Sequence, residues 1–277
     1  MGPRNVWAVY FSATGTTEKT VKTIAAAAAQ LLDCPWQAVS FTRPNERQEK
    51  LVFGGGDLVI VGTPVYAGRV PNVLLPFLKG NVSGNGALAV PVVLYGNRNY
   101  DDALMELRNI LTVNQFTCVA GAAFVGEHSF SRVLAAGRPD GEDLVLMAGF
   151  GEAVGRKVRR LAYTPPQELP VKVAGCEPIR PYYQPRDREG NFINILKVKP
   201  VTDPSRCNGC GLCAEKCPMG SIKADNVAEV AGICIKCCAC VKGCPTGAKY
   251  FADEGYLYHQ HELEEMYARR AEADMFL

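Results

Sequence analysis

The sequence predicts an α/β domain with a five-stranded parallel sheet, followed by a small α+β domain that is rich in cysteine. Two observations lead to this prediction. Residues 1 to about 162 alternate short apolar runs with amphipathic stretches, which is typical of strands joined by crossover helices in a parallel sheet. Nine of the twelve cysteines fall between Cys207 and Cys244. A chain of 277 residues accommodates one medium and one small domain of this kind.

The first domain is expected to place helices on both faces of its sheet. The candidate strands are Val6–Phe11, Gln37–Phe41, Leu58–Gly62, Leu88–Tyr95 and Thr117–Phe124. Apolar spacing predicts helices over Thr17–Leu32, Asp101–Leu111 and Glu142–Leu161. The run Gly54-Gly55-Gly56 precedes a strand and is interpreted as a turn. The pattern is that of a doubly wound, flavodoxin-like sheet.

Composition divides the rest of the chain. Eight prolines lie between Tyr163 and Arg206, and they predict an extended, semi-rigid linker in which Tyr182 and Tyr183 pack on a neighbouring domain. After Phe251 the chain becomes acidic and helix-prone, which predicts a solvated helix. The expected parts are a flavodoxin-like domain over 1–162, the linker over 163–200, a ferredoxin-like domain over 201–252 and an acidic helical tail over 253–277.

Net charge and hydropathy limit the partners and the location that the protein can have. The formal net charge of +2 provides no strong field for nucleic acid. No stretch approaches the roughly 20 consecutive apolar residues of a membrane span, and the N-terminus leads into a strand pattern instead of a signal peptide. We therefore expect a cytoplasmic protein. Without an export signal, twelve cysteines indicate metal binding in preference to disulfides.

One cysteine motif occurs twice, at an offset of 27 residues. The copies are Cys207-x2-Cys210-x2-Cys213-x3-Cys217-Pro218 and Cys234-x2-Cys237-x2-Cys240-x3-Cys244-Pro245. In the bacterial ferredoxin run, three close thiolates bind one [4Fe–4S] cluster and the fourth ligates the other. The predicted ligand sets are Cys207, Cys210, Cys213 and Cys244 for one cluster, and Cys234, Cys237, Cys240 and Cys217 for the other.

Zinc is the alternative for these cysteines, because paired C-x2-C units also form tetrahedral sites. Zinc needs only four ligands, however, and does not require this longer run twice. The four remaining cysteines are expected to be inert: Cys34, Cys118, Cys176 and Cys238.

A loop rich in hydroxyl groups joins the first strand to the first helix. It consists of Ser12-Ala13-Thr14-Gly15-Thr16-Thr17. Its amides and hydroxyls converge as donors, so a phosphate fits there. The loop lacks the motifs of ATP and dinucleotide sites, and the single phosphate of FMN is the best match. A helix cap without any ligand is the alternative.

Two further loops, Thr63–Gly68 and Gly96–Tyr100, follow strand ends at the carboxyl edge of the sheet. Ligands bind at this edge in open α/β folds. Tyr66 and Tyr100 are the candidates for stacking on a flavin ring, and the loop amides would contact its polar edge. A fourth loop, Gly126–Ser129, approaches the same edge, although His128 is equally interpretable as structural. The predicted FMN-binding residues are Ser12, Thr14, Gly15, Thr16, Thr17, Thr63, Pro64, Val65, Tyr66, Ala67, Gly68, Gly96, Asn97, Arg98 and Tyr100.

These motifs together resemble the flavodoxin–ferredoxin fusion proteins of anaerobic bacteria and archaea, often called "ferrodoxins". The resemblance covers nearly the whole chain, and it lies in Ser12–Thr17, Thr63–Val70, Tyr95–Leu107, Gly126–Ser131 and the two cysteine runs. It implies that Ser12 and Thr14–Thr17 hold the FMN phosphate and that Thr63–Gly68 and Gly96–Tyr100 bracket the isoalloxazine. The near-neutral charge departs from the acidic character that is usual in ferredoxins and flavodoxins.

The expected cofactors are therefore FMN and two [4Fe–4S] clusters. The expected function is low-potential electron transfer between them and redox partner proteins, with no nucleic acid and no membrane span involved. No acid, base or nucleophile constellation stands out. One alternative is an FMN-dependent oxidoreductase that reduces a quinone, nitro compound or free flavin with electrons from the clusters. Another is a scaffold or sensor whose flavodoxin-like domain has lost its cofactor.

Overall fold

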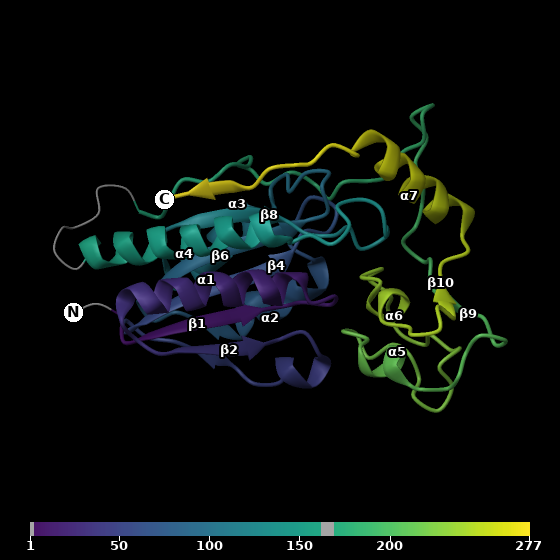
Figure 1. The fold of residues 1–277 in the computed structure, drawn as a ribbon, viewed down its shortest axis with the longest axis horizontal. Helices are drawn as coiled ribbons and strands as arrows, with labels where there is room; N and C mark the ends of the chain where they lie inside the picture. The colour runs from purple at the N-terminus through teal and green to yellow at the C-terminus, as the bar shows by residue number, and fades with distance from the viewer. Residues whose placement is uncertain (1–2, 162–168) are drawn as a thin grey trace.

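A computed structural model describes residues 3–161 and 169–277. It has two lobes (Figure 1): a larger one that holds the central sheet and its helices, and a smaller one that holds α5, α6, β9 and β10. The first residues of the predicted linker, 163–168, lie outside the described residues. Among the helices of the described residues, none is long and apolar enough to cross a bilayer.

The central sheet has the strand order β2-β1-β4-β6-β8-β11, in which the first five strands are parallel and β11 is antiparallel to β8. The strands are β1 Asn5–Tyr10, β2 Trp36–Ser40, β4 Asp57–Pro64, β6 Leu88–Tyr95, β8 Gly121–Val125 and β11 Asp274–Phe276. The parallel part has the strand order of flavodoxin-like sheets, so the predicted fold class is confirmed. The strand expected over Thr117–Phe124 is split into β7 Thr117–Cys118 and β8.

Helices cover both faces of the sheet. Figure 1 shows α1 (Thr16–Leu32) and α4 (Gly141–Leu161) side by side on one face. They approach closely because α4 carries glycines there: a Cβ at Gly151 would lie 2.5 Å from the carbonyl oxygen of Ile24. The other face packs against α2 (Leu75–Gly80) and α3 (Ala103–Val113).

Short elements complete this lobe. The two-residue strands β3 (Leu51–Val52) and β5 (Val82–Ser83) pair with each other, and 3₁₀ turns form at Pro44–Arg47 and Asn72–Leu74. The glycine run at 54–56 forms the expected turn between β3 and β4.

The small lobe is built on the cysteine repeat. Strands β9 (Val201–Thr202) and β10 (Lys249–Tyr250) pair antiparallel, and the single-turn helices α5 (Leu212–Glu215) and α6 (Ala239–Lys242) begin at equivalent positions of the two repeats. Each helix follows a residue with left-handed backbone, Gly211 (φ 73°) or Cys238 (φ 60°). Cys238 therefore occupies the place that a glycine takes in the first repeat.

The linker lies against the large lobe. Asp102, which is buried at the start of α3, accepts hydrogen bonds from the Arg180 guanidinium at 2.6 Å and from the Cys176 amide at 2.9 Å. The hydrogen bond from Arg180 is the main cause that holds the pKa of Asp102 at about 2. The Tyr182 hydroxyl donates to the Val70 carbonyl, as expected for a packing residue.

The C-terminal tail differs from the prediction. Helix α7 (Glu254–Met266) forms, but the chain then returns to the large lobe and adds β11 to the edge of its sheet. The side chain of Asn97 donates to the carbonyl oxygens of Tyr267 and Arg269, both at 2.6 Å, and accepts from the Ala271 amide at 3.2 Å. Strand β11 is only three residues long, so its own sequence gives no strand signal.

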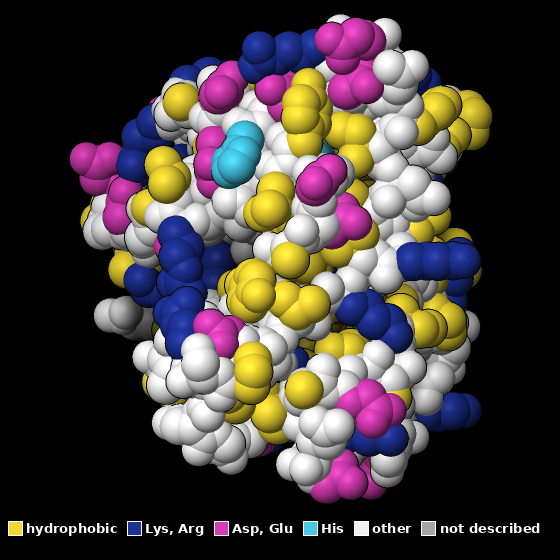
Figure 2. All heavy atoms as spheres, turned by 90° about the vertical axis from the view of Figure 1, so that its right-hand side faces the viewer, with side chains coloured by type: hydrophobic (Ala, Val, Ile, Leu, Met, Phe, Trp, Pro, Cys, Tyr) yellow, Lys and Arg dark blue, Asp and Glu magenta, His cyan; other side chains and the backbone are white. Residues whose placement is uncertain are grey.

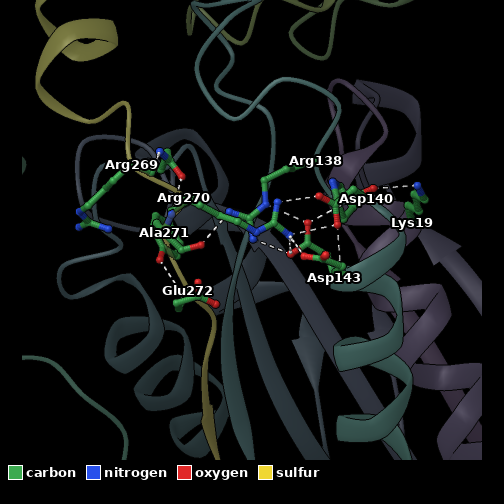
Figure 3. Close-up of polar contacts among 12 residues, drawn as sticks. Lys19, Arg138, Asp140, Asp143, Arg269, Arg270, Ala271 and Glu272 are labelled. Carbon is green, nitrogen blue, oxygen red and sulfur yellow. Dashed lines mark hydrogen bonds and ion pairs between the residues drawn. The ribbon is translucent and has the colours of Figure 1, made fainter.

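A buried ion pair holds the same segment beside α4 (Figure 3). The Arg138 guanidinium contacts Asp143 at 2.5 Å and donates to the Ala271 carbonyl at 2.7 Å, while Arg270 pairs with Asp140 at 2.7 Å. The small lobe is therefore attached to the large lobe through both ends of its chain, by the linker and by β11.

We expect Asn97→Ala to lower the free energy of unfolding by about 2–4 kcal/mol, because it leaves the buried Ala271 amide and two part-buried carbonyl groups of the returning segment without their partner. Urea denaturation followed by tryptophan fluorescence measures this loss in the large lobe, which holds both Trp7 and Trp36. The control is Asn194→Ala, which removes one exposed local hydrogen bond and should cost less than about 0.5 kcal/mol. Equal stability of the two variants would contradict the anchoring role of Asn97.

Candidate functional site

Four motif cysteines line one cavity of the small lobe, which we call the outer cysteine site: Cys207, Cys210, Cys213 and Cys244. Cys210 is exposed at the surface. Burial raises the pKa of Cys244, but hydrogen bonds from Thr246 and from backbone amides outweigh it and bring that pKa to about 7. The buried Lys249 also lines this cavity, and its ammonium group donates to the Val227 carbonyl at 2.5 Å.

The other four motif cysteines line a second cavity, the inner cysteine site: Cys217, Cys234, Cys237 and Cys240. Its remaining walls are mostly apolar, with Ile222, Ile233 and Phe251 among them. Burial raises the pKa of the Cys240 thiol to about 12 and that of Cys237 well above its ordinary value. These thiols are protonated at neutral pH, so binding of iron would release their protons.

The structure thus brings together the same two sets of four that the spacing predicts, each with three cysteines from one repeat and one from the other. The same kind of backbone contact also occurs within each repeat. The amide of Ser221 donates to the Cys217 sulfur at 3.3 Å, and the amide of Ala248 donates to the Cys244 sulfur at 3.2 Å. Such N–H···S contacts tune the reduction potential of a cluster.

Three of the four remaining cysteines do not line either cavity: Cys34, Cys118 and Cys176. Cys238 reaches the inner cysteine site, but its sulfur lies 3.3 Å from the Tyr256 hydroxyl. Within residues 3–161 and 169–277, no three His, Cys, Asp or Glu side chains are grouped closely enough to hold a single metal ion.

The hydroxyl-rich loop lies at the N-terminus of α1. Gly15 has a left-handed backbone (φ 89°), and among the described residues the amides of residues 14–17 have no hydrogen-bond partner. Thr14, Gly15 and Thr16 face a cavity of about 690 Å³ that extends to the small lobe. Ser12 instead accepts a hydrogen bond from the Glu18 amide at 3.1 Å, so its side chain supports the helix start.

A second cavity adjoins the first and lies between the strand-end loops. We call it the ring cavity; it is lined by Ala13, Thr14, Thr16, Thr17, Pro64, Val65, Tyr66, Leu94, Tyr95, Gly96, Gly126, Glu127, His128, Ser129 and Cys237. Burial raises the pKa of Tyr66 well above 10, and the neighbouring cysteine thiols add to the effect. Burial likewise lowers the pKa of His128 to about 3, so this imidazole is neutral.

Some predicted FMN-binding residues are not brought to the ring cavity: Thr63, Ala67, Gly68, Asn97, Arg98 and Tyr100. Asn97 holds the returning C-terminal segment, and the Tyr100 hydroxyl donates to Asp274 at 2.6 Å. Arg98 pairs with Asp101 and lies over the ring of Tyr183. The Thr63 hydroxyl is buried without a partner among the described residues. Of the two predicted stacking residues, Tyr66 lines the ring cavity, and Tyr100 contributes to the sheet edge.

Sequence reasoning identified Cys237 as a cluster ligand but missed that it joins the two kinds of site. Cys237 lines both the inner cysteine site and the ring cavity. The cavities of the two lobes therefore share a wall. No local signal announces this contact, because it depends on how the small lobe docks onto loops that lie more than a hundred residues earlier.

Comparison with known proteins agrees with this division. A family model described as a 4Fe–4S binding domain matches residues 200–223. The search of curated proteins gave no match.

Several solved structures are similar to the large lobe. One is a flavodoxin from the domain Archaea, with 14% identity and a TM-score of 0.36 over 56% of this chain and 99% of that chain. Another is an NADH:FMN oxidoreductase (EMOB) in its apo form, with 18% identity and a TM-score of 0.39 over 58% and 92%. A third is rubredoxin oxygen:oxidoreductase from the anaerobe Desulfovibrio gigas, with 17% identity and a TM-score of 0.36 over 59% and 38%. The family match lies on the first cysteine motif of the small lobe, and the large lobe has a flavodoxin-like strand order of its own.

We expect Cys217→Ala to lower the iron content from about eight to about four per chain, because Cys217 lies with the cysteines of the second repeat. Adding Cys237→Ala should cause little further loss, since both residues line the same site. Adding Cys207→Ala should remove nearly all the iron. Cys176→Ala, which changes an exposed cysteine outside both sites, is the control. If adding Cys237→Ala removed nearly all the iron and adding Cys207→Ala removed little more, Cys217 would have to be assigned to the cluster of the first repeat.

Proposed function

We propose that this protein is an electron carrier that binds FMN in the large lobe and two [4Fe–4S] clusters in the small lobe, and that it passes electrons between them. The observation that supports this most directly is the position of Cys237, which lines both the ring cavity and the inner cysteine site. Bound FMN would exchange two electrons in single steps, and each cluster would carry one.

The residues present fit these groups. The unpartnered amides of residues 14–17 offer donors to a phosphate, and the hydroxyls of Thr14 and Thr16 lie at the same place. Pro64–Tyr66, Gly96 and Gly126–Ser129 would surround the flavin ring. The two cysteine sites supply four sulfurs each, with backbone amides donating to the fourth sulfur of each motif.

The arrangement also favours transfer without diffusion. The linker and β11 attach the small lobe at both ends, and the Lys242–Glu127 ion pair, at 2.5 Å, joins α6 to the loop that lines the ring cavity. Two redox sites that are held next to each other in this way face each other at a high effective concentration. The exposed Cys210 places the outer cysteine site where a redox partner protein can reach it.

The proposal predicts about eight iron, eight sulfide and one FMN per chain after anaerobic purification and reconstitution. In partially reduced protein, electron paramagnetic resonance should show magnetic coupling between the flavin and a cluster. Cys237→Ala should abolish the coupling because it removes a ligand at the shared wall, whereas Cys210→Ala should leave it in place. Stoichiometric zinc with little iron, or no flavin bound, would refute the proposal.

The large lobe should bind FMN in preference to riboflavin, because the loop at α1 presents its donors to a phosphate that riboflavin lacks. Losing charge-assisted hydrogen bonds should weaken binding by at least about tenfold. Thr14→Val keeps the shape of the side chain and removes one donor, so it should lower the affinity for FMN and leave that for riboflavin nearly unchanged. Fluorescence titration of flavin-free protein with each ligand measures both. Equal losses for the two ligands would place the phosphate elsewhere.

A further inference from the structure

The cavity of about 690 Å³ in front of α1 has a strongly basic lining. Five cationic side chains line it, against a single carboxylate, that of Glu127. The cations are Lys19, Arg132, Arg138, Lys216 and Lys242. Figure 2, which looks onto the small-lobe end of the molecule, shows Lys and Arg side chains gathered beside a hollow on this end.

Two of these cations are paired. Lys242 contacts Glu127 at 2.5 Å, and Arg138 contacts the buried Asp143 at 2.5 Å (Figure 3). Their charges are therefore compensated next to the cavity.

The other three have no carboxylate partner among the described residues. Lys19 donates to the Pro139 carbonyl at 2.9 Å, and Arg132 donates to the Val241 carbonyl at 3.2 Å. Lys216 is exposed and makes no side-chain hydrogen bond or ion pair within the part of the chain that the structure describes. Three positive charges without a carboxylate partner thus line the same hollow as the unpartnered amides of residues 14–16.

These cations come from both lobes. Lys19 lies on α1 and Arg132 on the loop between β8 and α4, both in the large lobe, whereas Lys216 directly follows α5 in the small lobe, one residue before Cys217. A hollow lined by charges of one sign concentrates the field within it and attracts an ion of the opposite sign. A phosphate monoester, with nearly two negative charges at neutral pH, matches that field and the amide donors together.

We infer that the small lobe completes the FMN site: Lys216, with Lys19 and Arg132 from the large lobe, neutralises the phosphate that the α1 loop binds. The inference rests on the proposed FMN binding and adds to it a specificity device that spans the two lobes. In this arrangement the lobe that carries the cysteines also selects FMN over flavins without a phosphate.

Fluorescence titration of the full-length, cluster-loaded, flavin-free protein with FMN and with riboflavin tests the inference. At low ionic strength, Lys216→Gln and Arg132→Gln should each weaken FMN binding roughly threefold to tenfold and leave riboflavin binding unchanged. Lys216→Arg should retain the affinity for FMN. The control is Lys197→Gln, which removes an exposed lysine of the linker that lines none of the cavities described above and has no side-chain hydrogen bond or ion pair among the described residues. Raising the salt concentration should reduce the difference between wild type and Lys216→Gln.

The outcomes distinguish a failure of the proposed FMN binding from a failure of the proposed role of Lys216 and Arg132. If wild-type protein binds neither flavin, the proposed function fails. If it binds FMN but both Gln variants keep wild-type FMN affinity, or lose riboflavin affinity equally, the inference on Lys216 and Arg132 is overturned.

A second experiment titrates inorganic phosphate into FMN-loaded protein by calorimetry. Tight binding that Lys216→Gln abolishes, with FMN affinity unaffected, would also overturn it, because the cavity would then hold a second anion. Unchanged iron content and circular dichroism show that the variants fold.

Discussion

The return of the C-terminal segment to the edge of the large sheet is the constraint on which the rest of this molecule depends. Strand β11 pairs with β8, and Asn97 fixes the approach to it with three hydrogen bonds that involve backbone groups of residues 267, 269 and 271. The small lobe thereby becomes an insertion between two parts of one sheet domain. An insertion attached at both ends loses most of the rotation that a single linker would permit, so its docked position costs little further entropy.

That docked position determines what the cavities can do together. With both tethers in place, α6 lies against the loop after β8, where Lys242 pairs with Glu127 and donates to the His128 carbonyl at 2.7 Å. The same contact presents Cys237 to the ring cavity and Lys216 to the basic cavity in front of α1. The closeness of the ring cavity to the inner cysteine site and the proposed selection of FMN are therefore two results of a single interface, and a change that loosens it should weaken both.

How much of this could be predicted depends on whether the signal is local. The parallel strands, helices α1, α3 and α4, and the two cysteine sets follow from periodicity and spacing within a few tens of residues, and the structure brings them together as expected. Strand β11 could not be predicted, because three residues that pair with an edge some 150 positions away need no alternating pattern of their own. The sequence assigns Tyr100 and Asn97 to the flavin because they follow a strand end. The returning segment, which the sequence does not predict, takes up their polar groups instead. The basic cavity combines residues from both lobes and has no motif.

The two cysteine sites are structurally alike but differ in exposure, and this difference gives the proposed relay a direction in space. The inner site has two buried and two half-buried cysteines and mostly apolar walls, and it shares Cys237 with the ring cavity. The outer site exposes Cys210 and is lined in part by polar side chains and by the buried Lys249. In the proposed relay the inner site would therefore adjoin the flavin, and the outer site would be the one that a partner protein can reach.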